Sequence, residues 1–171
     1  MRVLIVEDEV VIAWMLADSL EGAGHEVIGP AAAMAEALAL CEALRPPELA
    51  LLDINLRDGS NGVDVARALL ERWGVPSIFV SAQTVEARWA RDIALGHIRK
   101  PYRPETVLRS VEVAREVMDG RTPRHVPAGF ELFSASRGAH SVPGPRPNGA
   151  TWGHIRKKKT RSRRFGMGGT C

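Results

Sequence analysis

The chain has 171 residues, of which 45% are hydrophobic and 25% are charged, and its formal net charge is +3. These values are ordinary for a globular domain, and the sequence has no apolar run near the roughly 20 residues of a membrane span. Secretory signal features are absent, and Cys41 and Cys171 lack the spacing of a metal or disulfide motif, so we expect a cytoplasmic protein with no membrane contact.

The charge divides the chain into two parts. Residues 1–120 hold 12 Lys and Arg residues against 19 Asp and Glu residues, a net charge of −7. Residues 121–171 hold 11 against 1, a net charge of +10, and are rich in Gly, Pro, Ser and Arg. We therefore predict a domain boundary near Gly120, followed by a basic tail that is disordered.

Short apolar runs alternate with segments of helical periodicity up to Gly120. In chain order, we expect strands over residues 2–6, 25–29, 49–52, 75–80 and 97–99. Apolar residues recur at helical spacing over residues 11–20, 34–44, 63–73, 85–93 and 107–118. Trp14, Trp73 and Trp89 lie on these helical stripes and are most simply packing residues. Five strands and five helices in alternation predict an α/β fold with a parallel sheet covered on both faces.

The stretch around Asp53 organises this fold. Leu49, Ala50, Leu51 and Leu52 show no polar alternation, which is typical of a strand buried on both faces. Asp53 follows directly, at the carboxyl end of this central strand, where open α/β sheets bind their ligands. Its carboxylate is expected to be a nucleophile, a metal ligand or both.

Polar residues also end the other strands. Glu7 and Asp8 follow the first strand, Ser81 follows the fourth and Lys100 follows the fifth. Carboxylates crowded at one edge repel unless a cation intervenes, and a few hard oxygen ligands suit Mg²⁺. A carboxylate nucleophile, a divalent metal, a lysine and a hydroxyl are the groups that phosphoryl transfer requires.

In residues 1–120 the chain resembles the receiver domain of two-component response regulators. The motifs that carry the resemblance, in chain order, are Val6-Glu7-Asp8-Glu9, Leu51-Leu52-Asp53-Ile54-Asn55-Leu56, Gly62, Ser81-Ala82 and Lys100-Pro101. The resemblance implies a flavodoxin-like, doubly wound sheet of five parallel strands in the order 2-1-3-4-5 with five helices. It implies a response regulator of a phosphorelay, in which catalysis is limited to Mg²⁺-dependent self-phosphotransfer and autodephosphorylation.

The resemblance also assigns roles to individual residues. It implies that Asp53 accepts a phosphoryl group from a histidine kinase or phosphotransfer protein, and that Ser81 and Lys100 contact that group. Asp8 and Asp53 would ligate Mg²⁺ together with the Asn55 backbone carbonyl, and Glu7 would assist through water. The Lys100-Pro101 peptide bond would be cis.

One position departs from the family pattern. His97 stands three residues before Lys100, where the family usually has an aromatic residue whose rotamer reports phosphorylation. Ser81, His97 and Pro101 are therefore the expected switch residues. The resemblance implies a downstream protein partner on the face formed by the fourth helix, fifth strand and fifth helix, and allows a homodimer.

Simpler interpretations exist for each of these residues. An isolated Glu-Asp pair after a strand is more often a solvated turn, and Asp53 or Ser81 alone would usually cap a helix. His97 alone would be a partly buried spacer.

Two other functions are also open. The basic run over residues 156–164 would suit a nucleic-acid-binding regulator. An aspartyl-phosphate phosphatase of the haloacid dehalogenase type also uses Asp, Mg²⁺ and Lys. That type expects a second Asp where this chain has Asn55.

Overall fold

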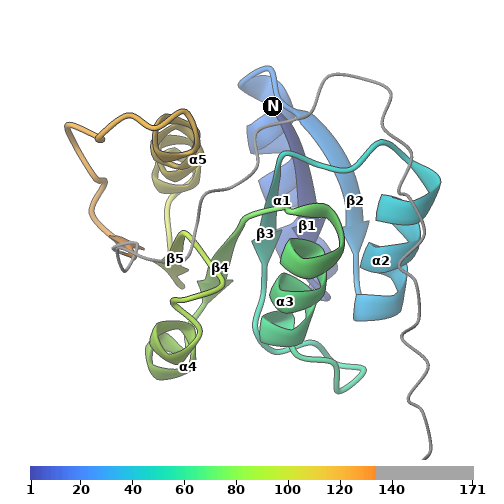
Figure 1. Cartoon of the computed structure of the whole chain (residues 1–171). Helices are drawn as coiled ribbons and strands as arrows, with labels where there is room; N and C mark the ends of the chain where they lie inside the picture. The colour runs from blue at the N-terminus through green and yellow to red at the C-terminus, as the bar shows by residue number, and fades with distance from the viewer. Residues whose placement is uncertain (134–171) are drawn as a thin grey trace, which may run out of the picture.

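The computed structural model describes residues 1–133 as one sheet between two layers of helices (Figure 1). Its strands are β1 (Arg2–Val6), β2 (Glu26–Ala31), β3 (Leu49–Leu52), β4 (Ser77–Ser81), β5 (Gly96–Arg99) and β6 (Phe130–Leu132). Its helices are α1 (Val10–Gly22), α2 (Met34–Ala43), α3 (Gly62–Trp73), α4 (Thr84–Trp89) and α5 (Pro104–Met118).

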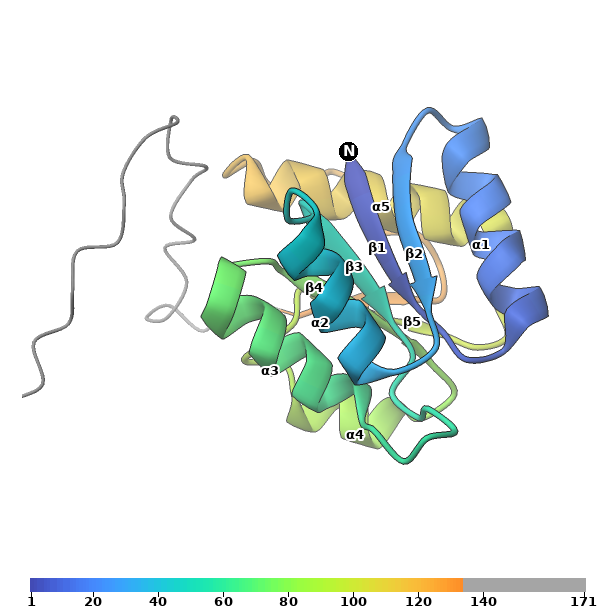
Figure 2. The same cartoon turned by 90° about the vertical axis from the view of Figure 1, so that its right-hand side faces the viewer.

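The sheet order is β2-β1-β3-β4-β5-β6, and the first five strands are parallel. Helices α1 and α5 cover one face, and α2, α3 and α4 cover the other (Figures 1 and 2). The predicted doubly wound α/β fold, with parallel strands in the order 2-1-3-4-5 and five helices, is therefore confirmed. Because these strands are parallel, their carboxyl ends meet at one edge of the sheet.

The core is divided by the sheet into two apolar layers. In β1, Val3 and Ile5 pack toward α1 and α5, whereas Leu4 and Val6 pack toward α2 and α3. The other central strands alternate in the same way, as the pleat requires. Both faces of β1, β3 and β4 are thus buried, which explains why their sequences are continuous apolar runs rather than alternating ones.

The structure differs from the predicted five-stranded sheet at its far edge. Strand β6 pairs antiparallel with β5, so the ordered part of the fold extends past the boundary predicted near Gly120. Phe130 and Phe133 are buried there, and the Phe133 N–H donates to the Leu95 carbonyl at 2.9 Å. A three-residue strand is too short to show periodicity, which is why the sequence pattern did not reveal it. The rest of the predicted disordered tail, including residues 156–164, lies outside the described residues.

Two of the three tryptophans expected to pack are exposed. Trp14 on α1 is 71% exposed and Trp89 on α4 is 83% exposed, whereas Trp73 is half-buried beneath the Arg72 guanidinium, 4.5 Å from its ring centre. Helix α1 instead buries Ala13, Leu16 and Leu20. The two leucines belong to the apolar stripe predicted over residues 11–20. The packing prediction was wrong for Trp14 and Trp89 because α1 and α4 each have apolar residues on more than one side.

Two element boundaries also differ from the sequence prediction. Helix α4 ends at Trp89 rather than continuing to residue 93. Strand β2 continues through Pro30 to Ala31, although the predicted strand ended at residue 29. Proline is tolerated there because β2 lies at the edge of the sheet and pairs only with β1.

At the amino edge of the sheet, Arg2 connects three segments of the chain. Its backbone N–H donates to Glu48 Oε2 at 2.7 Å, and its guanidinium pairs with Glu26 at 2.9 Å. The guanidinium also donates to the carbonyls of Arg45 and Pro46. The Arg2 side chain is only 11% exposed, so these partners rather than water stabilise its charge. Within residues 1–133, no helix is long and apolar enough to cross a membrane.

Candidate functional site

Three carboxylates gather at the carboxyl edge of the sheet. Glu7 and Asp8 follow β1, and Asp53 follows the neighbouring strand β3. The two strand ends are aligned because the Asp53 N–H donates to the Val6 carbonyl at 2.8 Å. One oxygen of each carboxylate lies within 4.8 Å of the other two. Glu7 is buried, and Asp8 and Asp53 are half-buried, so their mutual repulsion is only partly screened by water.

Lys100 extends from the end of β5 into this carboxylate cluster. Its Nζ lies 2.7 Å from Asp53 Oδ2 and 2.7 Å from Glu7 Oε2. Burial lowers the Lys100 pKa, but the hydrogen bonds to Asp53 and Glu7 outweigh this effect, and the pKa is raised above its usual value. Burial raises the Glu7 pKa, and Lys100 partly opposes that rise. The ammonium group is therefore held in its charged form between the carboxylates of Asp53 and Glu7.

The donor set fits a hard divalent cation. Carboxylate oxygens in small number are the ligands that Mg²⁺ prefers, and it keeps several waters in such a site. Half-buried Asp8 pairs with exposed Arg57 at 2.9 Å, an interaction that a cation would compete with. The Asn55 N–H donates to Asp53 Oδ1 at 3.3 Å, which orients the carboxylate. The role expected of the Asn55 carbonyl stays a prediction.

Gly62 fixes the turn beside Asp53. A Cβ at this position would lie 2.0 Å from the Asp53 carbonyl oxygen, which no side chain can tolerate. The Gly62 N–H donates to the Ile54 carbonyl at 2.8 Å and begins α3 directly against the site. The sequence motif contains this glycine. Only the fold shows why a glycine is needed there, because only the fold shows the close approach of the Gly62 backbone to the Asp53 carbonyl.

Ser81 ends β4, and His97 lies within the neighbouring strand β5, two residues before Arg99, which pairs with Ser81 in the register. The Ser81 carbonyl accepts hydrogen bonds from the Lys100 N–H at 3.1 Å and from His97 Nε2 at 2.8 Å. Since a carbonyl only accepts, His97 carries a proton on Nε2. His97 is buried, and burial lowers its pKa. The Ser81 hydroxyl accepts from the Gln83 N–H at 3.2 Å, so Ser81 joins the Lys100 loop, His97 and the start of α4.

An apolar pocket adjoins the carboxylate cluster and was not expected from the sequence. It has a volume of about 360 Å³ and lies between α1 and the β5–α5 loop. Lys100 lines it, together with Met15 of α1 and Tyr102 of the loop. Burial raises the Tyr102 pKa, so its hydroxyl stays neutral. The Lys100-Pro101 peptide bond that begins this loop is cis, as expected.

Comparison with known proteins agrees with this arrangement. The model of the response regulator receiver domain family matches residues 3–112. The phyllosphere-induced regulator PhyR of Methylorubrum extorquens is 44% identical over 81 residues, which cover 47% of this chain and 30% of PhyR. The DNA-binding response regulator MtrA of Mycobacterium tuberculosis is 36% identical over 119 residues, which cover 64% of this chain and 48% of MtrA.

Solved structures show the same fold. A CheY-like receiver domain protein from Methanospirillum hungatei is 30% identical, with a TM-score of 0.61 over 70% of this chain and 96% of its own. The PhyR receiver domain from Erythrobacter litoralis is 32% identical, with a TM-score of 0.61 over 73% and 95%. The chain thus spans less than half the length of the curated relatives PhyR and MtrA, and nearly all of the isolated receiver domains.

Proposed function

Because this chain belongs to the response regulator receiver domain family, we propose that it accepts a phosphoryl group on Asp53 and signals through the resulting change of conformation. The donor is a phosphohistidine of a histidine kinase or phosphotransfer protein. The observation that carries the proposal is the position of Lys100 Nζ, 2.7 Å from Asp53 Oδ2 at the carboxyl edge of the sheet. A carboxylate held against an ammonium group is where a transferred phosphoryl group would be neutralised.

The proposed step moves one phosphoryl group between two side chains. A bond forms between an Asp53 carboxylate oxygen and phosphorus, and the bond from phosphorus to the donor histidine nitrogen breaks, leaving that imidazole neutral once protonated. Lys100 then shifts from the free carboxylate to a phosphoryl oxygen, and the Ser81 hydroxyl contacts another. The dominant contribution of the protein is positioning and charge neutralisation.

Mg²⁺ is the proposed cofactor, held by Asp8, Asp53 and the Asn55 carbonyl, with Glu7 assisting through water. When bound, it would neutralise the negative charge that gathers on the phosphoryl oxygens. Glu7 also holds Lys100 in place through its 2.7 Å hydrogen bond. The simpler reading of Glu7 and Asp8 as a solvated turn does not account for the burial of Glu7.

The exposed apolar face of α1 supports a docking site for the phosphodonor. Val11, Trp14 and Met15 are 67%, 71% and 59% exposed, and Met15 also lines the pocket next to Lys100. Exposed large apolar side chains beside a reactive group favour a protein that docks there. A donor helix on α1 would bring its histidine to Asp53.

The signal is proposed to pass through Ser81 and His97 to the face formed by α4, β5 and α5. When the Ser81 hydroxyl turns toward the phosphoryl group, it releases the Gln83 N–H at the start of α4. His97 then adjusts because it shares the Ser81 carbonyl with Lys100. A downstream protein, or a second copy of the chain, would recognise the altered face.

Phosphorylation by a small phosphodonor tests the proposal directly. With acetyl phosphate and Mg²⁺, intact-mass measurement should show one added phosphoryl group on the full chain and none on Asp53→Asn. Asp58→Asn is the matched control, because Asp58 lies in the same loop, is exposed and bonds only to Ser60. Equal phosphorylation of Asp53→Asn and the wild type would overturn the assignment, as would full phosphorylation in excess chelator.

A further inference from the structure

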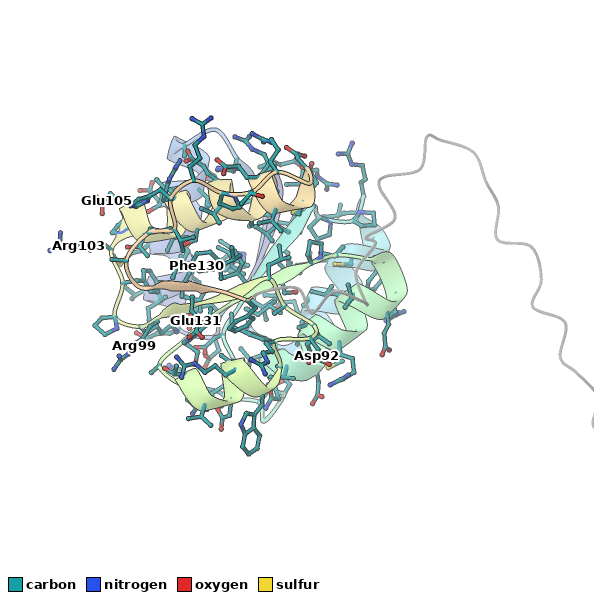
Figure 3. The ribbon with its side chains drawn as sticks, turned by 60° about the vertical axis from the view of Figure 1, so that its left-hand side comes forward. Asp92, Arg99, Arg103, Glu105, Phe130 and Glu131 are labelled. Carbon is teal, nitrogen blue, oxygen red and sulfur yellow. The ribbon has the colours of Figure 1, made fainter. Side chains whose placement is uncertain are left out.

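The segment that follows α5 and contains β6 folds back along the edge of the sheet at β5. It runs antiparallel to β5, and the Gly129 carbonyl accepts from the Arg99 N–H at 3.0 Å. Figure 3 shows Phe130 on the α5 side of β6 and Glu131 on the α4 side. The Arg88 Nε–H on α4 donates to both carboxylate oxygens of Glu131, each at 3.0 Å. The edge of β5 is therefore already occupied, and a partner cannot bind there by adding a strand.

A groove remains between this segment and the beginning of α5. Its volume is about 800 Å³. Tyr102 and Pro127 contribute apolar surface, and four basic side chains line it: Arg99, Arg103, Arg109 and His125. Figure 3 shows Arg99 and Arg103 at the same end of the molecule, where α5 begins. The groove is thus lined by both apolar surface and basic side chains.

The positive charge of the groove is only partly compensated. Within residues 1–133, neither Arg99 nor Arg103 forms an ion pair, and Arg109 pairs with Glu112 of its own helix. Glu105 is the one acidic residue among the described residues that line the groove. Residues 1–120 as a whole carry a net charge of −7. The groove is therefore basic although the surrounding domain is acidic, and a basic cluster of this kind favours a negatively charged partner.

We propose that this groove binds an acidic peptide segment of a partner protein. Two carboxylates of the peptide would pair with Arg99 and Arg103, and an apolar side chain between them would contact Tyr102 and Pro127. Arginine binds carboxylates through paired hydrogen bonds, which gives such a contact directional specificity. The proposal is independent of Asp53 phosphorylation, because the groove is formed in the unmodified protein.

Charge and size exclude two other occupants. The chain's own residues 134–171 contain nine Lys and Arg residues and no Asp or Glu, so the basic side chains of the groove would repel them. A small anion such as inorganic phosphate would fill a minor part of an 800 Å³ groove and would leave its apolar surface uncovered. An extended peptide with both acidic and apolar side chains uses both features.

Selection from a random peptide library tests the proposal on the full chain. Phage-displayed peptides of about twelve residues are selected on the wild-type protein, after peptides that bind Arg99→Glu/Arg103→Glu have been removed. This step discards peptides that bind the basic tail, which both proteins share. A selected peptide is then synthesised, and its affinity is measured by fluorescence anisotropy.

We expect the selected peptides to be enriched in Asp and Glu around an aromatic or aliphatic residue. Arg99→Glu/Arg103→Glu should weaken binding about tenfold or more, whereas the matched control Arg67→Glu/Arg91→Glu, at exposed positions outside the groove, should change it less than twofold. Amide shifts on peptide binding should fall on residues 99–109 and 125–129. Peptides without acidic enrichment, equal binding by both double variants, or shifts centred on α1 would overturn the proposal. So would a failure to select any peptide while inorganic phosphate or RNA shifts the same amides.

Discussion

Removing the Phe130 side chain tests whether β6 belongs to the folded domain. Phe130 is 7% exposed and packs among the apolar side chains between β5 and α5. Phe→Ala substitutions in cores cost about 3–5 kcal/mol. We take about 3 kcal/mol for Phe130→Ala, because β6 is a short edge strand that can move to reduce the cavity. For a domain of this size, that loss corresponds to a fall in Tm of about 10 °C.

Urea and thermal unfolding of the full chain measure this loss, and amide exchange locates it. The Arg99 N–H and the Phe133 N–H, which bond across the β5–β6 edge, should exchange faster in Phe130→Ala, whereas amides of β1 and β3 should be less affected. Val126→Ala is a control in the same segment, since Val126 is 38% exposed. A Phe130→Ala variant that unfolds at the wild-type temperature, with unchanged exchange at β5, would refute the assignment of β6 to the core.

Three further predictions concern the site and its surroundings. Because binding to the folded state stabilises it, Mg²⁺ should raise the Tm of the wild type and of Asp58→Asn but not that of Asp8→Asn. Thermal melts with and without Mg²⁺ measure this, and an equal rise in Tm for all three proteins would contradict the metal site. Gly62→Ala should lose several kcal/mol of unfolding free energy, because the new Cβ would clash with the Asp53 carbonyl. The control Gly22→Ala has open space around the new Cβ, so its free energy of unfolding, measured in urea, should change little or rise by up to about 1 kcal/mol. Burial lowers the His97 pKa, so the unfolded chain takes up a proton first and stability falls as the pH drops below 6.5. His97→Phe should flatten that fall when unfolding is followed between about pH 7.5 and pH 5, and an unchanged slope would assign it to other groups.

The site was predictable because it depends on which residue follows each strand. Parallel strands carry their carboxyl ends to one edge, so apolar runs that end in Glu7, Asp53 and Lys100 were enough to bring these residues together. The sequence could not show that Lys100 bridges Glu7 and Asp53, because that depends on side-chain reach across two strands. The close approach of Gly62 to the Asp53 carbonyl was hidden for the same reason.

Features that depend on the far edge and the outer surface were not predictable. Strand β6 was not predicted, because three residues of strand carry no periodicity and the surrounding segment is rich in Gly, Pro, Ser and Arg. Trp14 and Trp89 looked like core residues because apolar spacing alone does not say which side of a helix faces the sheet. That exposed side is where we expect partners to bind.

The Arg2 network lies at the amino edge of the sheet, opposite the carboxylate cluster. It joins β1 to Glu26 of β2 and to the loop before β3, and none of its contacts reaches the carboxyl edge. One end of the sheet is therefore held by contacts that converge on a buried arginine, while the other end carries the carboxylates and the lysine of the candidate site. Substitutions at the carboxyl edge should therefore leave the Arg2 contacts at the amino edge unchanged. Substitutions at Arg2 should accordingly reduce the abundance of the protein in a cell, while the molecules that remain folded should accept the proposed phosphoryl group on Asp53 at the wild-type rate.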